Sequence, residues 1–553
     1  MLDIYYGFNA FDPNHWSWAI RYSRVYGKFP EYLVAGCWVA SLSFFFLFIL
    51  LQIIATRLQA RTTYGGRTAK DLHGSARWAT TRDIKKAGLF NSSGVVVGGW
   101  STFLGKIRPL RHDGPEHILI FAPTRSGKGI SVVIPTLLYW KESALVLDIK
   151  GENWIKTSGY RSKLGQRILK FDPASVAGGL RFNPLAEVRI STDYQVADAQ
   201  NIAAMIIDPD GKGLADFWAK SGFSWLTATI LFTLYKINKE EGRVANLTDV
   251  DEILTASAGG GIESLLLEMI NFDSGDAVAN EVIHAAGQEM TDRAGPERSG
   301  VQSSSKVDLA IYRDPIVAKN IAVSDFRLCD LMDADNPASL YLIVPPQDID
   351  RLRPLLRVIL NLFMRRLLTK IGTTSHKHRL LLMLDEFTSI GKLEIFERSL
   401  AFMAGYGLKA VLIVQNLKQL QGVYGRDNAI MGNCNIRVAT APNDIDTANI
   451  LSQMCGKATV IQTKRSRSRS SSQTVGNISE NSYEVGVALI TPDECMRLIA
   501  PKTSKKNPTL VIKPGAMLTF ISGYPPILGQ QPLYFLDKDL LSRSEILPIG
   551  NLK

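Results

Sequence analysis

The sequence predicts an α/β protein with a parallel central sheet, a helical insertion between two parts of that sheet, and one apolar helix near the N-terminus. Two apolar segments, 117–121 and 379–384, predict the sheet, because each reads as a buried parallel strand and leads directly into a polar motif. The third observation is the uncharged run at 32–55, which is long enough to span a bilayer.

Length, charge and cysteine content narrow the class of protein. A chain of 553 residues has room for about two to four domains. The net charge of +11 is compatible with contact to nucleic acid or anionic lipid but does not distinguish them. The five cysteines are scattered without a CxxC pair, which argues against a disulfide framework or a zinc site and fits a reducing cytosol.

The N-terminal part is expected to meet a membrane. The run at 32–55 predicts one transmembrane helix, and residues 1–31 before it are expected to form a short extracytoplasmic, loop-like segment. The basic residues on either side of the run are too evenly divided to set its orientation. Residues 56–110 are predicted to be a membrane-proximal linker region.

A phosphate-binding loop follows the first apolar strand, over residues 122–129. Its turn and the helix expected after it would direct backbone N–H groups toward one anion, and Lys128 would add a charge for the β- and γ-phosphates. The loop departs from the usual pattern at Ala122, which replaces a glycine, and at Gly129, which replaces the Ser or Thr that normally binds Mg²⁺. The residues expected to bind nucleotide are Thr124, Arg125, Ser126, Gly127, Lys128 and Gly129. The alternative is that these residues form an ordinary strand–turn–helix without a bound nucleotide. A second motif is therefore needed to support nucleotide binding.

An acidic pair, Asp385 and Glu386, ends the second apolar strand and supplies that motif. We expect Asp385 to hold Mg²⁺ through water and Glu386 to polarise the water that attacks ATP. Gln415 follows the apolar run at 410–414 and is placed to sense the γ-phosphate, with capping of the next turn as the alternative. The expected catalytic residues are Lys128, Asp385, Glu386 and Gln415, with ATP and Mg²⁺ as cofactors.

The long separation between the two motifs predicts an insertion. Residues 190–325 look mainly helical, and the uncharged stretch at 221–235 is too short for a membrane, so it predicts a buried helix. An all-α domain at 190–325 would divide the ATPase domain into a first part at 111–189 and a second part that, with the C-terminal tail, covers 326–553. The basic stretch at 464–481 has no apolar core and is expected to be a mobile loop. Further strands are expected at 144–148, 339–344 and 436–439.

Seven groups of motifs, in order along nearly the whole chain, resemble the TraG-type coupling proteins of type IV secretion and conjugation systems. They are HGSARWA at 73–79, the phosphate loop with VIPTLL at 133–138, LDIKGE at 147–152, FNPL at 182–185, LDEF at 384–387 with GKL at 391–393, IVQN at 413–416, and TPDE at 491–494. Their joint occurrence is far more specific than any one of them. The resemblance implies a RecA-like P-loop domain with an inserted all-α domain, and many members also carry glycine at the position of Gly129.

The same resemblance implies an activity and a set of partners. Members are hexameric ATPases of the bacterial inner membrane that couple substrates to a type IV secretion channel. The implied partners are a relaxase bound to single- or double-stranded DNA, secreted effector proteins, the channel proteins with their partner ATPases, and the membrane. Because ATP is cytosolic, the bulk of the chain after residue 55 is expected in the cytoplasm.

Two features depart from the family pattern. Members usually have two membrane spans, so the first span is either absent here or lies upstream of residue 1. Some members place an arginine eleven positions before the strand-end glutamine, where it reaches the neighbouring subunit's nucleotide, and here that position is Ala404. Arg398 and Arg437 are candidates for this trans arginine, and either could instead form a structural ion pair.

Two other functions fit parts of the sequence. A receptor scaffold that binds nucleotide with little turnover would account for Gly129 and Ala404. A DNA translocase of the chromosome-segregation type would share the ATPase motifs but would lack the segments at 73–79 and 491–494. The sequence does not distinguish DNA cargo from protein cargo.

Overall fold

The computed structural model describes residues 12–27, 31–62, 72–102, 105–208, 213–214, 216–255, 261–368, 376–468, 477–507 and 510–549. Their contacts define two compact units. Unit 1 combines the residues up to Ala76 with Lys457–Val487, and unit 2 combines Arg77–Gly456 with the residues from Ala488 onward. Both nucleotide motifs lie in unit 2.

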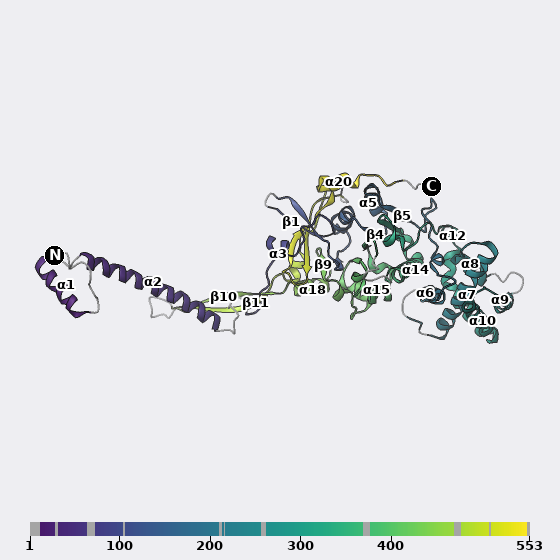
Figure 1. Ribbon diagram of the computed structural model, residues 1–553, viewed down its shortest axis with the longest axis horizontal. Coiled ribbons are helices and arrows are strands. Elements are labelled where there is room, and N and C mark those ends of the chain that lie inside the picture. Colours follow the sequence, from purple (N-terminus) through teal and green to yellow (C-terminus); the bar gives the residue numbers. More distant parts are fainter. Residues whose placement is uncertain are drawn as a thin grey trace. The chain divides into compact units, whose positions relative to one another are not determined.

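Unit 2 is built on an eleven-stranded sheet of order β2-β1-β15-β14-β9-β3-β8-β7-β4-β6-β5 (Figure 1). The parallel strands are β5 (Arg167–Phe171), β6 (Ala338–Ile343), β4 (Ser143–Asp148), β7 (Leu380–Leu384), β8 (Leu408–Val414), β3 (Ile118–Phe121) and β9 (Ile436–Ala439). The antiparallel strands are β14 (Ala516–Ile521), β15 (Ile527–Gln530), β1 (Val95–Ser101) and β2 (Ile107–His112). The predicted strands are therefore present, and the α/β class is confirmed.

Side chains of the parallel strands alternate between two apolar cores, one on each face of the sheet. In β4, Leu145 and Leu147 belong to one core, whereas Ala144 and Val146 belong to the other. Every residue of β3, β4, β6, β7 and β8 is buried. Burial on both faces explains why these strands are continuous apolar runs in the sequence.

The described residues between β5 and β6 form helices and no strand. The elements are η3 (Pro184–Glu187), α6 (Gln195–Ile207), α7 (Phe217–Glu241), α8 (Leu247–Thr255), α9 (Gly261–Asn271), α10 (Ala277–Asp292), α11 (Gly295–Lys306), η4 (Val307–Arg313), α12 (Pro315–Ile321) and α13 (Asp330–Asp333). Helices α6 to α10 gather in one group in Figure 1. All residues of α7 from Trp225 to Tyr235 are buried, as predicted for most of the uncharged stretch at 221–235. The limits of a separate all-α domain stay a prediction.

The remaining helices of unit 2 connect the strands and cover the sheet. They are α3 (Thr81–Lys86), η2 (Gly129–Val133), α4 (Ile134–Tyr139), α5 (Glu152–Lys163), η5 (Pro346–Asp348), α14 (Ile349–Leu367), η7 (Phe387–Ile390), α15 (Glu394–Ser399), η8 (Met403–Tyr406), α16 (Leu417–Tyr424), α17 (Ile430–Asn433), α18 (Ile445–Cys455), α19 (Pro492–Met496), η9 (Tyr534–Leu536) and α20 (Lys538–Ser544). A small sheet pairs β12 (Lys502–Thr503) with β13 (Val511–Lys513).

Part of the predicted linker at 56–110 is sheet. β1 and the first residues of β2 fall in this range, and β1 pairs with both β2 and β15. The hydroxyl of Thr519 in β14 also donates a 2.5 Å hydrogen bond to the carbonyl of Val97 in β1. These strands therefore extend the sheet that carries the nucleotide motifs, and the N-terminal boundary of the ATPase domain stays a prediction.

Unit 1 contains α1 (Pro13–Tyr26), α2 (Glu31–Thr62) and the two-stranded sheet of β10 (Lys457–Ser468) and β11 (Asn477–Ala488). The mobile loop expected at 464–481 is therefore wrong for residues 464–468 and 477–481, which are strand. Arg and Ser alternate from Arg465 to Ser468 with the two-residue period of a strand, and the missing apolar residues had hidden that period. Residues 469–476 lie outside the described part of the chain.

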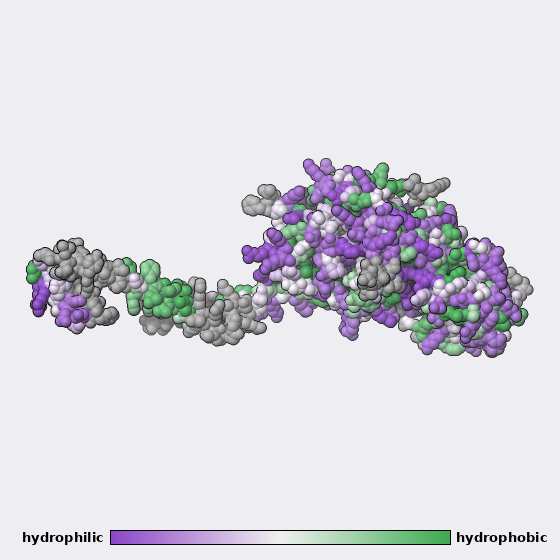
Figure 2. All heavy atoms as spheres, in the orientation of Figure 1, coloured by the Kyte–Doolittle hydropathy of each residue, from purple (hydrophilic) through white to green (hydrophobic). Residues whose placement is uncertain are grey.

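The described side chains of α2 are exposed, and most of them are apolar. They include Phe44, Phe46 and Leu50, and Figure 2 shows hydrophobic residues gathered over this helix. Within the described ranges, however, no helix meets the length and hydropathy that crossing a membrane requires. The transmembrane helix at 32–55 therefore stays a prediction.

Candidate nucleotide-binding site

The phosphate loop begins in the middle of the sheet. Strand β3 lies between β8 and β9, and the N–H of Ala122 continues the pairing with a 2.9 Å hydrogen bond to the carbonyl of Val414. The chain then turns through Arg125 and Gly127, whose φ angles of 60° and 83° are both in the left-handed region. Glycine is favoured at such an angle, which explains Gly127. The turn leads into η2 and α4, so the sequence-predicted strand, loop and helix are all present.

The acidic pair begins directly after β7, which is separated from β3 only by β8. Glu386 has a φ of 61°, an uncommon conformation for a residue with a side chain. Phe387, the next residue, is fully buried and stacks on Tyr424 with ring centroids 5.2 Å apart. The packing of Phe387 therefore fixes the backbone that carries the two carboxylates.

Lys128, Asp385, Glu386 and Gln415 come together at this edge of the sheet. Nζ of Lys128 lies 2.8 Å from Oδ1 of Asp385 and 2.5 Å from Oε1 of Glu386. Nε2 of Gln415 donates a 3.2 Å hydrogen bond to the other oxygen of Glu386. The structure thus brings all four predicted catalytic side chains into one cluster, although they come from three different strand ends.

The ammonium of Lys128 is held by charge. Burial lowers the pKa of Lys128, but the carboxylates of Asp385 and Glu386 outweigh that effect, so its pKa lies above the ordinary value. The contact between Nζ and Oδ1 of Asp385 is an ion pair, and this carboxylate oxygen is buried. Phosphate oxygens would compete with the two carboxylates for this ammonium.

The residues present fit a nucleotide with Mg²⁺. The hydroxyl of Ser126 is buried and has no hydrogen-bond partner among the described residues, so it remains open to a ligand. Asp385 offers a carboxylate oxygen, the ligand type that Mg²⁺ prefers. Thr124 and Arg125 are exposed in the loop, and Arg125 forms no ion pair within the described chain. A Cβ built on Gly129 would meet no atom within 4 Å, so the place of the missing hydroxyl is open space.

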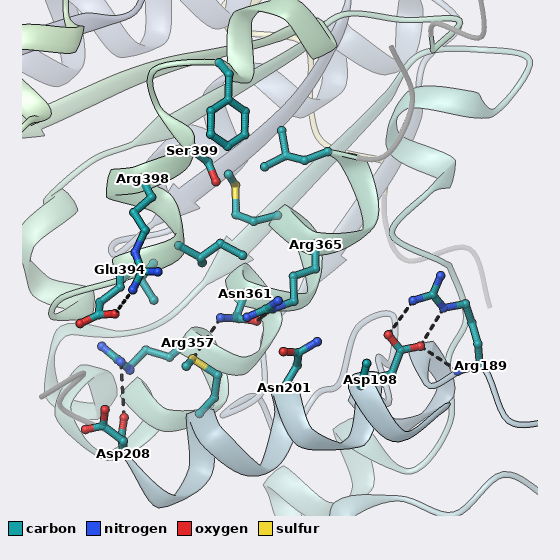
Figure 3. Close-up of a pocket in the computed structure, with 17 residues that line it drawn as sticks. Arg189, Asp198, Asn201, Asp208, Arg357, Asn361, Arg365, Glu394, Arg398 and Ser399 are labelled. Atoms are coloured by element: carbon teal, nitrogen blue, oxygen red, sulfur yellow. Dashed lines mark hydrogen bonds and ion pairs between the residues drawn. The ribbon is translucent and has the colours of Figure 1, made fainter. Parts of the chain in front are cut away.

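The two candidates for a trans arginine differ in their surroundings. Both Nε and Nη2 of Arg437 donate to the carbonyl of Met431, at 3.2 and 2.8 Å, which makes Arg437 a structural residue. The side chain of Arg398 is 76% exposed and pairs with Glu394 one helical turn earlier. Arg398 lines a cavity of about 680 Å³ between α6, α14 and α15. Figure 3 shows Arg398 there together with Arg357. No residue of the phosphate loop lines this cavity.

One residue at the site escaped the sequence analysis. Gln531, directly after β15, is completely buried and donates a 2.6 Å hydrogen bond from Nε2 to the carbonyl of Ser126. No local signal marks it, because the contact joins residues far apart in the sequence and depends on the antiparallel strands, which the sequence did not predict.

Comparison with known proteins identifies the family. The family described as "Type IV secretory system Conjugative DNA transfer" matches residues 68–547. The chain belongs to this family. Among curated proteins, a conjugal transfer protein TraG of Escherichia coli is 42% identical over 96% of this chain and 87% of its own length. A VirD4 protein of Rhizobium radiobacter is 27% identical over 85% of this chain and 64% of that protein. The chain is therefore a coupling protein of the TraG type.

Solved structures of similar fold are those of the conjugative coupling protein TrwB. An unbound form, TrwBdeltaN70, superposes with a TM-score of 0.58 at 18% identity, and the match covers 83% of this chain and 92% of the TrwBdeltaN70 chain. TrwB in complex with ADP and Mg²⁺ gives a TM-score of 0.57 at 16% identity, with 83% and 94% coverage. For this coupling protein the likeness confirms the RecA-like α/β fold predicted from the sequence.

Proposed function

We propose that this chain is a membrane-anchored, hexameric ATPase that couples DNA or protein substrates to a type IV secretion channel. The observation that carries the proposal is the convergence of Lys128, Asp385 and Glu386 beside a loop shaped to receive phosphate. The family supplies the setting, since its description is conjugative DNA transfer. The TrwB complexes with ADP and Mg²⁺ and with ADPNP support ATP and Mg²⁺ as the ligands.

Each residue of the cluster has a role that follows from its position. Lys128 would exchange its two carboxylate partners for the β- and γ-phosphates, while backbone N–H groups of the loop bind the same oxygens. Mg²⁺, when bound, would neutralise phosphate charge, and Asp385 would hold it through water. Departure of the ammonium would free Glu386 to polarise the attacking water. Gln415, already hydrogen-bonded to Glu386, would keep that carboxylate oriented and sense the γ-phosphate.

The substrate-reading surface is proposed to lie on the helices between β5 and β6. The carboxyl edge of the sheet is committed to ATP, so cargo recognition requires other surface, and these helices are the largest addition to the sheet. The cargo would be a relaxase with its DNA strand, secreted effectors, or both, and the channel proteins with their ATPases would receive it. Arg398, exposed on α15, is the better candidate to reach a neighbouring subunit's nucleotide.

Residues 32–55 are proposed to anchor the chain in the inner membrane, with the bulk of it in the cytoplasm. The support is the run of exposed apolar side chains on α2, among them Phe44, Phe45 and Phe46. Deletion of residues 1–55 is expected to move the chain from the membrane pellet to the supernatant while it still binds ATP, because unit 2 carries every nucleotide motif. Ultracentrifugation without detergent checks this; full-length chain in the supernatant would contradict the anchor.

A receptor scaffold with little turnover is the second candidate function. The observation that favours it is Gly129, since the hydroxyl that usually binds Mg²⁺ is missing. Phosphate release from ATP by the purified chain, measured with and without DNA, separates the two functions. Turnover above that of a variant lacking the catalytic carboxylate supports the ATPase.

Gly129→Ser is expected to strengthen Mg²⁺-dependent ATP binding. The space around Gly129 admits a side chain, and one added ligand contact is worth about 0.5–1.5 kcal/mol, which corresponds to roughly 2- to 10-fold in Kd. The measurement is Kd for ATP at graded Mg²⁺ concentrations. Gly129→Ala is the matched control, because it adds the Cβ without the hydroxyl. Identical Mg²⁺ dependence in the two variants would show that the hydroxyl does not reach the metal.

A further inference from the structure

Gln531 connects the phosphate loop to the C-terminal part of the sheet through both ends of its side-chain amide. Nε2 donates to the carbonyl of Ser126 at 2.6 Å, and Oε1 accepts a 3.0 Å hydrogen bond from the N–H of Gly515. The backbone N–H of Gln531 also donates to the carbonyl of Gly515 at 2.9 Å. The side chain is completely buried, so these protein groups, rather than water, satisfy the amide.

The contact to Ser126 bears on how the loop presents its N–H groups. In a planar trans peptide the C=O of one residue and the N–H of the next point in opposite directions. Gln531 holds the carbonyl of Ser126 on the side of the C-terminal strands. The N–H of Gly127 is thereby directed to the opposite side, away from the C-terminal strands.

The neighbouring C-terminal residues reinforce this arrangement. Tyr534 and Leu540 pack with Ile134 and Leu138 of α4 in a small apolar cluster of their own. An Nη atom of Arg543 donates a 3.1 Å hydrogen bond to the carbonyl of Leu138. The segment from β15 to α20 thus contacts both the phosphate loop and the helix that follows it. Gln531 is its one side chain with a described hydrogen bond to the loop itself.

We propose that Gln531 is a positioning residue for nucleotide binding: its amide fixes the Ser126–Gly127 peptide so that the N–H of Gly127 faces the phosphate. The inference rests on the proposed ATPase function and adds a C-terminal residue to the site. It assigns the Nε2 donor to the loop and the Oε1 acceptor to the strand. These two halves of one amide can be separated by substitution.

Gln531→Glu separates them. The introduced carboxylate keeps an acceptor for Gly515 but loses the donor to Ser126 and faces its carbonyl with negative charge. We expect Kd for ADP to rise about 10- to 100-fold at about pH 8. This is the size of one lost hydrogen bond to a charged group, here the bond from the N–H of Gly127 to phosphate. KM for ATP should rise far more than kcat falls. Near pH 6 the defect should shrink, because a protonated carboxyl can donate to Ser126 again.

Two comparisons make the test decisive. Gln530→Glu introduces the same charge at the exposed preceding residue and should leave Kd unchanged. Gln531→Met keeps the volume, loses both hydrogen bonds and should also weaken ADP binding, which covers the case in which the glutamate variant does not fold. The melting temperature without nucleotide reports any purely structural effect.

The outcomes are distinct. If wild type binds ADP and both Gln531 variants bind it equally well, with only the melting temperature lowered, Gln531 is a strand brace and the inference fails. A wild-type chain that does not bind ADP at all would instead overturn the proposed function. Weaker binding that recovers near pH 6 in Gln531→Glu alone supports the assignment of the donor to Ser126.

Discussion

Lys128→Ala is expected to abolish ATP turnover and substrate transfer while leaving the chain folded. Lys128 supplies an ammonium at the carboxyl edge of β3 and β7, where it neutralises Asp385 and Glu386 and is poised for phosphate. Without it, two adjacent carboxylates remain at the place where phosphate charge must enter. We expect loss of turnover by at least about 10²-fold, on the scale of a missing electrostatic contact in the transition state. Phosphate release by the purified variant is the measurement.

The matched control for this prediction is Lys141→Ala. Lys141 is exposed before β4 and forms no ion pair among the described residues, so its removal changes the same charge without touching the cluster. The control should turn over ATP as wild type does. Wild-type hydrolysis by Lys128→Ala would show that the nucleotide binds elsewhere.

Glu386→Gln is expected to bind ATP and hydrolyse it about 10²–10³-fold more slowly. The substitution keeps the shape of the side chain and a hydrogen-bond acceptor but removes the charge that would polarise water. ATP binding should persist, because Lys128 and the loop are intact and Lys128 loses one of the carboxylates that compete with phosphate. Single-turnover hydrolysis and a separate measurement of Kd distinguish the chemical step from binding.

Asp385→Asn provides the comparison for Glu386→Gln. It removes the neighbouring charge and should weaken Mg²⁺-dependent binding rather than the chemical step alone. The two carboxylates are adjacent in sequence and both contact Lys128, so a difference in phenotype reports their separate roles. Equal turnover by Glu386→Gln and wild type would assign the water to another residue.

The parallel half of the sheet and its site could be predicted because the signals are local. β3, β7 and β8 are buried on both faces, so each is an unbroken apolar run, and the polar residue that follows each run falls at the carboxyl edge of the sheet. Their side-by-side order then brings Lys128, Asp385 and Gln415 together. The ion pairs within the cluster follow from that order and from the charges.

The antiparallel half could not be predicted in the same way. β1 pairs with β15, and Val97 bonds to Thr519, across more than four hundred residues of chain. Such pairings leave no periodic signal in either segment, so the sequence predicts a linker where β1 lies and gives no indication of Gln531. The second half of β10 was missed for another reason, because Arg and Ser alternate from Arg465 to Ser468 without apolar residues.

The most direct test of the central claim is ATP turnover by the purified full-length chain, measured beside Glu386→Gln, with and without single- and double-stranded DNA. If the chain is a coupling ATPase, wild type should release phosphate at a rate at least about 10²-fold higher than that of Glu386→Gln, and this rate should depend on Mg²⁺. Wild-type turnover no higher than that of Glu386→Gln, with ATP still bound, would contradict the claim and leave a nucleotide-binding scaffold.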